Sequence, residues 1–214
     1  MITNYMVNKY LITGGSGRLG KELKKWWKEA DYPTHDQLDI TEPIKRKRKY
    51  DLIIHCAAYT NVADSKQACK LCYDINVNGT KNLLKAYKDI PFVYISTEYA
   101  VNPTTYYSET KQLAEREVVK HPHHLIIRTL FKPRPYPFNR AFYDQYTMGD
   151  YVDVIAELII GEIILWNNGE RKSKLMYIGT GRKSIYDLAK QTRPDVKRES
   201  VDVISWVKLP KDYL

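Results

Sequence analysis

The sequence predicts an α/β protein built on a doubly wound parallel sheet, and three observations support this prediction. Glycines at positions 14, 17 and 20 lie between an apolar run and an amphipathic segment. Apolar runs recur at residues 51–58, 92–97 and 125–128, as in strands that are buried on both faces. Helix-compatible segments alternate with these runs. Such alternation produces a parallel sheet with right-handed crossovers.

The first element is the stretch KYLITGGSGRLG, from Lys9 to Gly20. Residues 10–12 are predicted to form a strand and residues 19–28 a helix. Between them, one glycine makes the tight turn, one lets backbone N–H groups approach a pyrophosphate, and one lets helix and strand pack closely. Phosphate groups then lie at the positive end of the helix dipole. The stretch therefore predicts a dinucleotide site that uses Gly14, Ser16, Gly17, Arg18, Leu19 and Gly20.

The next elements complete the predicted sheet. A weak strand is expected at residues 32–34, before the segment LDIT at 38–41. A helix is expected over residues 65–88, with an interruption at 76–80. Another helix, over residues 105–120, has an apolar and a charged face and joins the strands at 92–97 and 125–128.

The chain changes character after Arg128. Three prolines in residues 132–137 remove backbone donors and fix φ, which excludes regular helix and central strand. We therefore divide the chain into a dinucleotide-binding domain, residues 1–130, and a small substrate-binding region packed on it, residues 131–214. In this second part a helix is expected from Tyr151 to about Gly161, a strand at 176–178 and a helix at 184–191.

Length and composition fit one soluble α/β domain with a small appendage. The chain has 214 residues, of which 43% are hydrophobic and 28% charged. The N-terminal residues lack the sustained apolar core of a signal peptide, and the apolar stretch Leu158 to Trp166 is too short to span a bilayer. We expect a cytoplasmic protein without a membrane partner.

The three cysteines do not predict a disulfide framework. Cys69 and Cys72 have metal-ligand spacing, but no second cysteine or histidine pair lies nearby to complete a zinc site. The favoured interpretation is that they are small apolar residues of a helix. No metal site is predicted.

The net charge of +9 allows a nucleic-acid partner, and residues 45–49, KRKRK, form the densest basic run. Lysine and arginine are nevertheless spread along the whole chain, and this run lies between two strand signals. A solvated surface is the favoured interpretation. A basic surface also suits anionic ligands such as nucleotide diphosphates.

Tyr107 and Lys111 are the residues on which a catalytic reading depends. They lie four positions apart and so share one face of the predicted helix. A lysine cation beside a phenol favours the phenolate and lowers the pKa of the tyrosine, which then exchanges a proton with a carbonyl or an alcohol. Thr97, at the end of the preceding strand, is placed to donate a second hydrogen bond to the same oxygen.

Together these motifs resemble the extended short-chain dehydrogenase/reductases. The ordered set is Gly14-x-x-Gly17-x-x-Gly20, Ala57 to Thr60, Asn76-x-x-Gly79-Thr80, Ser96-Thr97 and Tyr107-x-x-x-Lys111. Within this group the chain is most similar to the dTDP-4-dehydrorhamnose reductase family. The segments that carry this similarity are LDIT (38–41), AAYTNVADS (57–65), ISTEYAV (95–101), IIRTLF (126–131) and YVDVIAELI (151–159).

The resemblance implies a Rossmann-like NAD(P)-binding fold and a role for each motif. Thr97, Tyr107 and Lys111 would be catalytic: Tyr107 would protonate a sugar keto oxygen while hydride arrives from the nicotinamide. Lys111 would also hold the nicotinamide ribose. The residues implied around the rest of the cofactor are Asp39, Ile40, Ala57, Ala58 and Tyr59. For Asp39, a helix N-cap is the alternative.

The substrate side departs from the family pattern. Glu98 stands where relatives usually carry Asp, only nine residues separate Thr97 from Tyr107, and the region after Phe131 is short. We expect a shallow pocket that a second subunit, as in a homodimer, or a mobile segment closes. The predicted substrate ligands are Glu98, Tyr99, Arg134 and Arg140, the two arginines gripping a diphosphate.

The cofactor is predicted from the end of the second strand. An NAD-selective site would place a carboxylate there to bind the ribose 2′-OH. This chain has Thr34-His35, with Asp36 just beyond, and Arg18 in the glycine turn. NADP(H) is therefore favoured and NAD(H) stays the alternative.

These inferences predict an NADP(H)-dependent reductase of a 4-keto-6-deoxy sugar nucleotide. One alternative is a sugar-nucleotide epimerase or dehydratase on the same scaffold. Another is a non-catalytic NADP-binding regulatory subunit, which has no need of the tyrosine–lysine pair. A nucleic-acid binder is the third and least favoured.

Overall fold

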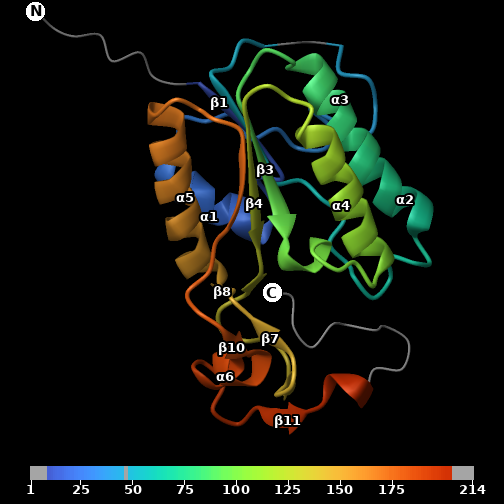
Figure 1. Ribbon diagram of the computed structural model, residues 1–214, viewed down its shortest axis with the longest axis vertical. Coiled ribbons are helices and arrows are strands. Elements are labelled where there is room, and N and C mark those ends of the chain that lie inside the picture. The colour runs from blue at the N-terminus through green and yellow to red at the C-terminus, as the bar shows by residue number, and fades with distance from the viewer. Residues whose placement is uncertain (1–8, 46–47, 204–214) are drawn as a thin grey trace, which may run out of the picture.

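The computed structural model describes residues 9–45 and 48–203. Its centre is a five-stranded sheet made of β1 (Tyr10–Thr13), β2 (Leu52–His55), β3 (Phe92–Thr97), β4 (His124–Thr129) and β9 (Lys174–Tyr177). Neighbouring strands are parallel and follow the order β1-β2-β3-β4-β9 (Figure 1). The predicted α/β class with a parallel sheet is confirmed.

The apolar runs become central strands because both faces of the sheet are covered. Ile12, Ile54 and Ile127 join one hydrophobic cluster, whereas Leu11 and Ile53, one position earlier, join another on the opposite face. Successive side chains of a strand point to opposite faces. A strand with layers on both sides therefore reads as continuously apolar.

Helices form these two layers. On one face lie α1 (Arg18–Trp26) and α5 (Val152–Asn168), and on the other lie α2 (Cys69–Tyr73), α3 (Gly79–Ala86) and α4 (Tyr106–Val118) (Figure 1). A π-helix, Asp74–Asn78, joins α2 to α3 at the interruption that the sequence predicts. Within residues 9–45 and 48–203, each helix is too short or too polar to cross a membrane.

The strand expected at residues 32–34 is absent from the structure. In this segment, the residue that pairs with the sheet is Asp31, which forms an isolated parallel bridge with Leu11. The amide of Asp31 donates to the Tyr10 carbonyl, and its carbonyl accepts from Ile12. Pro33 follows, and a proline has no N–H to continue the ladder. The prediction is therefore wrong at these residues.

The last part of the chain is shared between two regions. A small region pairs β5 (Phe131–Lys132) with β8 (Asp150–Tyr151), β6 (Arg140–Phe142) with β11 (Lys197–Glu199), and β7 (Tyr146–Thr147) with β10 (Lys183–Ser184). It also contains α6 (Ile185–Lys190) and a 3-10 helix, Val201–Val203. Leu130, Tyr151 and Leu188 belong to its own hydrophobic cluster.

The other elements after residue 130 return to the large sheet. Helix α5 packs in the same cluster as α1, and β9 is the fifth strand. A boundary at residue 130 therefore does not separate the two structural regions. Helix α5 also continues seven residues past Gly161, to Asn168. A Cβ at Gly161 would meet nothing within 4 Å, so this glycine lies on an open side of the helix and does not end it.

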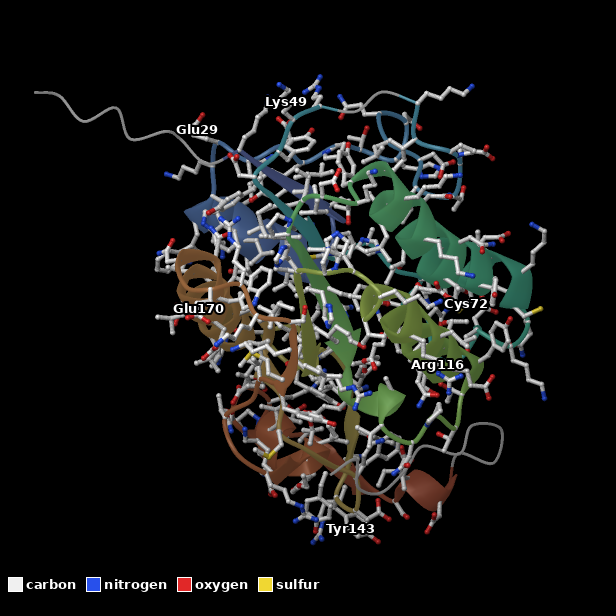
Figure 2. All side chains as sticks on the ribbon, turned by 45° about the horizontal axis from the view of Figure 1, so that its top comes forward. Glu29, Lys49, Cys72, Arg116, Tyr143 and Glu170 are labelled. Atoms are coloured by element: carbon white, nitrogen blue, oxygen red, sulfur yellow. The ribbon has the colours of Figure 1, made fainter. Side chains whose placement is uncertain are left out.

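Lys49, the last residue of the basic run at 45–49, lies at the end of the molecule opposite the small region (Figure 2). Arg46 and Lys47 fall outside the described residues. Lys49 and Tyr143, a residue of the small region, mark the two ends (Figure 2). Lys49 shortly precedes β2 and so lies at the amino edge of the sheet.

Candidate active site

A cavity of about 920 Å³ opens at the carboxyl edge of the parallel sheet. The segments that follow β1, β2, β3 and β4 all contribute to its wall. Ligand sites of open α/β sheets lie at this edge. The sequence-predicted residues that line it are Gly14, Ser16, Gly17, Arg18, Leu19, Gly20, His35, Asp39, Ile40, Ala57, Ala58, Thr97, Tyr99, Tyr107 and Lys111.

The glycine turn is built as the sequence predicts. Gly14 has a φ of 74°, in the left-handed region that favours glycine. A Cβ at Gly20 would come within 2.6 Å of the Gly15 Cα, so this position lets α1 pack against the turn. Gly17 is different, because a Cβ there would meet only the Gly14 carbonyl, at 3.1 Å. Gly14 and Gly20 thus serve the fold, whereas Gly17 is the N-cap of α1 and lines the cavity.

Replacing Gly17 by valine is expected to abolish NADPH binding while the chain stays folded. The branched side chain would occupy the space through which a diphosphate approaches the first N–H groups of α1. NADPH titration by fluorescence measures the affinity, and circular dichroism checks the fold. Gly161→Ala, in open space outside the cavity, is the matched control. Wild-type affinity in Gly17→Val would contradict the assignment of this turn to a diphosphate.

Thr97 and Tyr107 meet at the cavity wall. Thr97 ends β3, and Tyr107 lies in the first turn of α4, which a capping box between Thr105 and Ser108 fixes. The Ser65 hydroxyl accepts the Tyr107 amide at 3.1 Å. Burial raises the pKa of Tyr107 to about 12, against the lowering effect of its hydrogen bond with Thr97. The phenol is therefore protonated at neutral pH.

Lys111 is held by the sheet instead of by Tyr107. Its Nζ donates to the Ile95 carbonyl at 2.8 Å and lies 4.0 Å from the centroid of the Tyr94 ring. Burial lowers the pKa of Lys111 to about 7. The sequence predicts that this lysine lowers the pKa of Tyr107, but the structure has the opposite shift, because burial dominates both groups. The protonated phenol is the form that donates a proton.

Lys111 is expected to make the free protein more stable as pH rises above about 7. Its pKa of about 7 lies below the value of ~10.4 in an unfolded chain. Between these values the unfolded chain binds the extra proton, so the free energy of unfolding rises with pH, by at most ~1.4 kcal/mol per pH unit. Urea denaturation of wild type and Lys111→Met across this range isolates the contribution. Parallel curves for the two proteins would contradict the depressed pKa.

A buried ion pair that the sequence does not reveal supports this wall. Arg128 donates to both carboxylate oxygens of Glu115, Nε to Oε1 at 2.9 Å and Nη2 to Oε2 at 2.6 Å. Ser96 donates to the same carboxylate at 2.5 Å, and Arg128 reaches the Tyr177 hydroxyl at 2.8 Å. The group ties α4 to β3, β4 and β9. Its members are far apart in sequence, so no local pattern links them.

Asn76 was likewise missed as a site residue. It lies in the π-helix, where its Oδ1 accepts the Tyr59 amide at 2.8 Å and its Nδ2 donates to the Thr110 hydroxyl at 2.9 Å. Thr110 also lies within hydrogen-bond distance of the Cys72 thiol, at 3.4 Å; Cys72 is buried, whereas Cys69 is exposed. Asn76 thereby fixes the loop after β2 to the helix that carries Tyr107.

At another part of the cavity, the Asp39 carboxylate accepts hydrogen bonds from the residue two positions later. Its Oδ1 accepts from the Thr41 amide at 2.9 Å and the Thr41 hydroxyl at 2.7 Å, and these bonds lower the pKa of Asp39. His35 Nε2 is 3.6 Å from Asp39 Oδ2. The following described residues form turns, so the helix N-cap alternative for Asp39 is wrong.

Four predicted site residues lie outside the described cavity lining. Tyr59 donates its hydroxyl to Asp64 at 2.6 Å. Glu98, in a 3-10 helix (Glu98–Ala100), is buried and accepts from the Thr147 hydroxyl at 2.7 Å and the Met148 amide at 3.2 Å. It therefore fastens the small region to the end of β3.

The other two are the arginines expected to hold a diphosphate. Arg134 donates to Asp153 at 2.8 Å and lies over the Tyr151 ring, while Arg140 donates to Glu199 at 2.9 Å. Both guanidinium groups are thus paired with carboxylates outside the cavity. Their role as substrate ligands stays a prediction.

Comparison with known proteins places this arrangement in a family. A family model described as the RmlD substrate binding domain matches residues 8–159. The chain belongs to this family. The predicted similarity to dTDP-4-dehydrorhamnose reductases is confirmed by a crystal structure of such an enzyme from Clostridium acetobutylicum, with a TM-score of 0.82 and 26% identity over 95% of this chain and 88% of that one.

Two further proteins are similar to this chain. A dTDP-4-dehydrorhamnose reductase from Bacillus anthracis, in complex with NADP, has a TM-score of 0.81 and 24% identity, over 95% of this chain and 88% of that one. A probable dTDP-4,6-dihydroxy-2-methyloxan-3-one 4-ketoreductase from Streptomyces antibioticus is 26% identical over 70% of this chain and 60% of its own length. The chain spans roughly half the length of the curated relatives that it matches.

Proposed function

We propose that this protein reduces the keto group of a 4-keto-6-deoxy sugar nucleotide with NADPH. One observation carries the proposal: Thr97, Tyr107 and Lys111 face the same cavity as the glycine turn. A cofactor cradle and a proton donor are thus brought to one place. Several relatives are named as sugar-nucleotide reductases, and these names support the substrate class.

The residues around the cavity fit a nicotinamide dinucleotide. The first turn of α1 would hold the diphosphate, Asp39 and Ile40 would flank the adenosine, and Lys111 would bind the nicotinamide ribose. When bound, the cofactor supplies the hydride. A Cβ at Gly14 or Gly20 would strike backbone, so the turn keeps the shape that such a ligand requires.

The proton would come from the Tyr107 phenol. With a pKa of about 12, this phenol holds its proton until a nearby oxygen becomes strongly basic, as a keto oxygen does when hydride reaches its carbon. Thr97, which lies beside Tyr107, would orient the phenol toward that oxygen. The Lys111 amine has a pKa of about 7, so it would take up a proton as negative charge develops on the phenol oxygen. The resulting ammonium group would stabilise the developing phenolate.

The basic groups at the cavity favour the phosphorylated cofactor. Arg18, Lys21 and His35 line it. Asp39 is the only carboxylate among the described lining residues, and Thr41 already occupies one of its oxygens. An NAD-selective site needs a carboxylate that is available to the ribose 2′-OH. NADP(H) is therefore the proposed cofactor.

The same lining residues argue against a dehydratase. Elimination of water next to a keto group needs an additional group that removes a proton from a sugar carbon. Glu98, the carboxylate next to Thr97 in the sequence, is buried and accepts hydrogen bonds from Thr147 and Met148. The reductase is distinguished from an epimerase and from a regulatory subunit by experiment.

The test is to mix the protein with NADPH and either dTDP-4-dehydrorhamnose or dTDP-4-keto-6-deoxyglucose, and to follow NADPH absorbance. A reductase consumes one cofactor per sugar reduced, and NADH should be used less efficiently. Product formed without net loss of NADPH would identify an epimerase or a dehydratase. Tight NADPH binding with no product from a panel of keto-sugar nucleotides would indicate the regulatory alternative.

A further inference from the structure

Lys132 is a cavity-lining cation that no catalytic role has used. It lies in β5, where its backbone pairs with Tyr151 of β8, and its half-buried side chain lines the cavity beside Pro133 and Phe138. In residues 9–45 and 48–203, no side chain or carbonyl forms a hydrogen bond or an ion pair with its ammonium group. Lys183, a nearby lysine of the small region, differs, because Asp150 and two further oxygens hold it.

The charges around Lys132 make this isolation costly. Burial and the Arg18 cation lower the pKa of Lys132 to about 8, and Glu98 opposes them. Glu98 already accepts hydrogen bonds from Thr147 and Met148. A partly buried cation without a partner is unfavourable. Half-buried Lys132 and exposed Arg18 line the same cavity, and two cations there favour the binding of an anion between them.

We propose that Lys132 and Arg18 together bind the diphosphate group of a nucleotide. This inference rests on the proposed function for the identity of that nucleotide. Arg18 belongs to the glycine turn, and Lys132 belongs to the small region, so the two walls of the cavity would close on one dianion. The diphosphate is either that of the cofactor or that of the sugar nucleotide.

On the substrate side, Lys132 is better placed to bind a diphosphate than the two arginines predicted from the sequence. Arg134 and Arg140 are paired with Asp153 and Glu199, so a diphosphate would have to break an ion pair to reach either of them. Lys132 has no such competitor. Its ammonium would gain a charge-assisted hydrogen bond where none exists, which is the stronger kind.

The first experiment measures the reactivity of Lys132 directly. Brief treatment of the folded wild type with acetic anhydride, followed by peptide mass spectrometry, reports how fast this amine reacts. The experiment is repeated with inorganic pyrophosphate, NADPH or dTDP. We expect Lys132 to be protected by pyrophosphate and by one of the two nucleotides, whereas exposed Lys85 reacts equally throughout. Protection by NADPH assigns the cofactor diphosphate, and protection by dTDP assigns the substrate diphosphate.

The second experiment measures affinity. Lys132→Met should weaken binding of the protecting nucleotide roughly 10- to 100-fold, the range for one hydrogen bond to a charged group. Lys132→Arg should retain most of it, and Lys85→Met should be unchanged. Wild-type affinity of Lys132→Met for both NADPH and dTDP would overturn the inference, whatever the labelling shows.

The two experiments separate this inference from the proposed reaction. If no keto-sugar nucleotide is reduced, yet Lys132→Met lowers the affinity for NADPH or dTDP, the reaction is wrong and the diphosphate site stands. If reduction is observed and Lys132→Met binds both nucleotides normally, the reaction stands and the diphosphate site is wrong. A wild type that binds neither nucleotide would contradict both.

Discussion

Tyr107→Phe is expected to lower the turnover of a keto-sugar nucleotide roughly 10²–10⁴-fold, the usual range for losing a general acid. The phenol faces the cavity beside Thr97 and is protonated at neutral pH, with a pKa of about 12. Phenylalanine keeps the ring that fills the wall and removes only the proton donor. NADPH affinity should therefore stay close to that of the wild type.

Steady-state kinetics and NADPH titration test this prediction together. The neighbouring Tyr106 provides a matched control, because it begins α4 but is not part of the described cavity lining. Tyr106→Phe should leave kcat within about twofold of wild type, since half-buried Tyr106 lies outside the described lining and a hydroxyl away from the site makes a small contribution. A Tyr107→Phe variant with wild-type turnover would remove this residue from the mechanism.

Arg128→Met is expected to lower the free energy of unfolding by about 3–5 kcal/mol, the cost of breaking a buried ion pair from one side. The Glu115 carboxylate is 6% exposed and the Arg128 side chain 14% exposed. Without the guanidinium, Glu115 would keep only the Ser96 hydrogen bond and would be buried as an uncompensated charge.

Urea denaturation measures this loss, and two variants interpret it. Adding Glu115→Gln to Arg128→Met should recover part of the stability, because the isolated charge is removed as well. The pair Arg140–Glu199 is the exposed counterpart, with Arg140 61% exposed, and Arg140→Met should cost no more than ~1 kcal/mol. Equal losses for Arg128→Met and Arg140→Met would show that burial does not set the strength of the pair at Glu115.

The strands and the glycine turn were predictable because their signals are local. Residues 92–95 are a continuous run of large, mostly apolar side chains, and β3 has the predicted bounds, 92–97. The strand at residues 32–34 failed because a single proline outweighed a weak apolar pattern. The end of α5 was misplaced because Gly161 looks like a terminator, although its neighbours Ile160 and Ile163 are buried and keep the helix in the core.

The substrate side was less predictable because tertiary placement decides where its side chains point. Arg134 and Lys132 are two residues apart, yet one pairs with Asp153 and the other lines the cavity. Glu98 follows Thr97 directly, but its carboxylate is taken up by Thr147 and Met148. Sequence spacing does not report such partners, because they come from strands far along the chain.

The π-helix at Asp74–Asn78 has a consequence for the helices on either side of it. One extra residue in a helical turn rotates everything after it by about 100° relative to an uninterrupted α-helix. The face that α3 directs to the core is therefore rotated relative to the face that continues from α2. Loss of a single residue from this turn would rotate α3 about its axis relative to α2. Leu83, which is fully buried against the sheet, would then turn toward solvent. Asn76 would lose its contact with the backbone of Tyr59. The number of residues in this turn is thus as constrained as their identity. Insertions or deletions here should be tolerated only when they return α3 to the same rotation relative to α2.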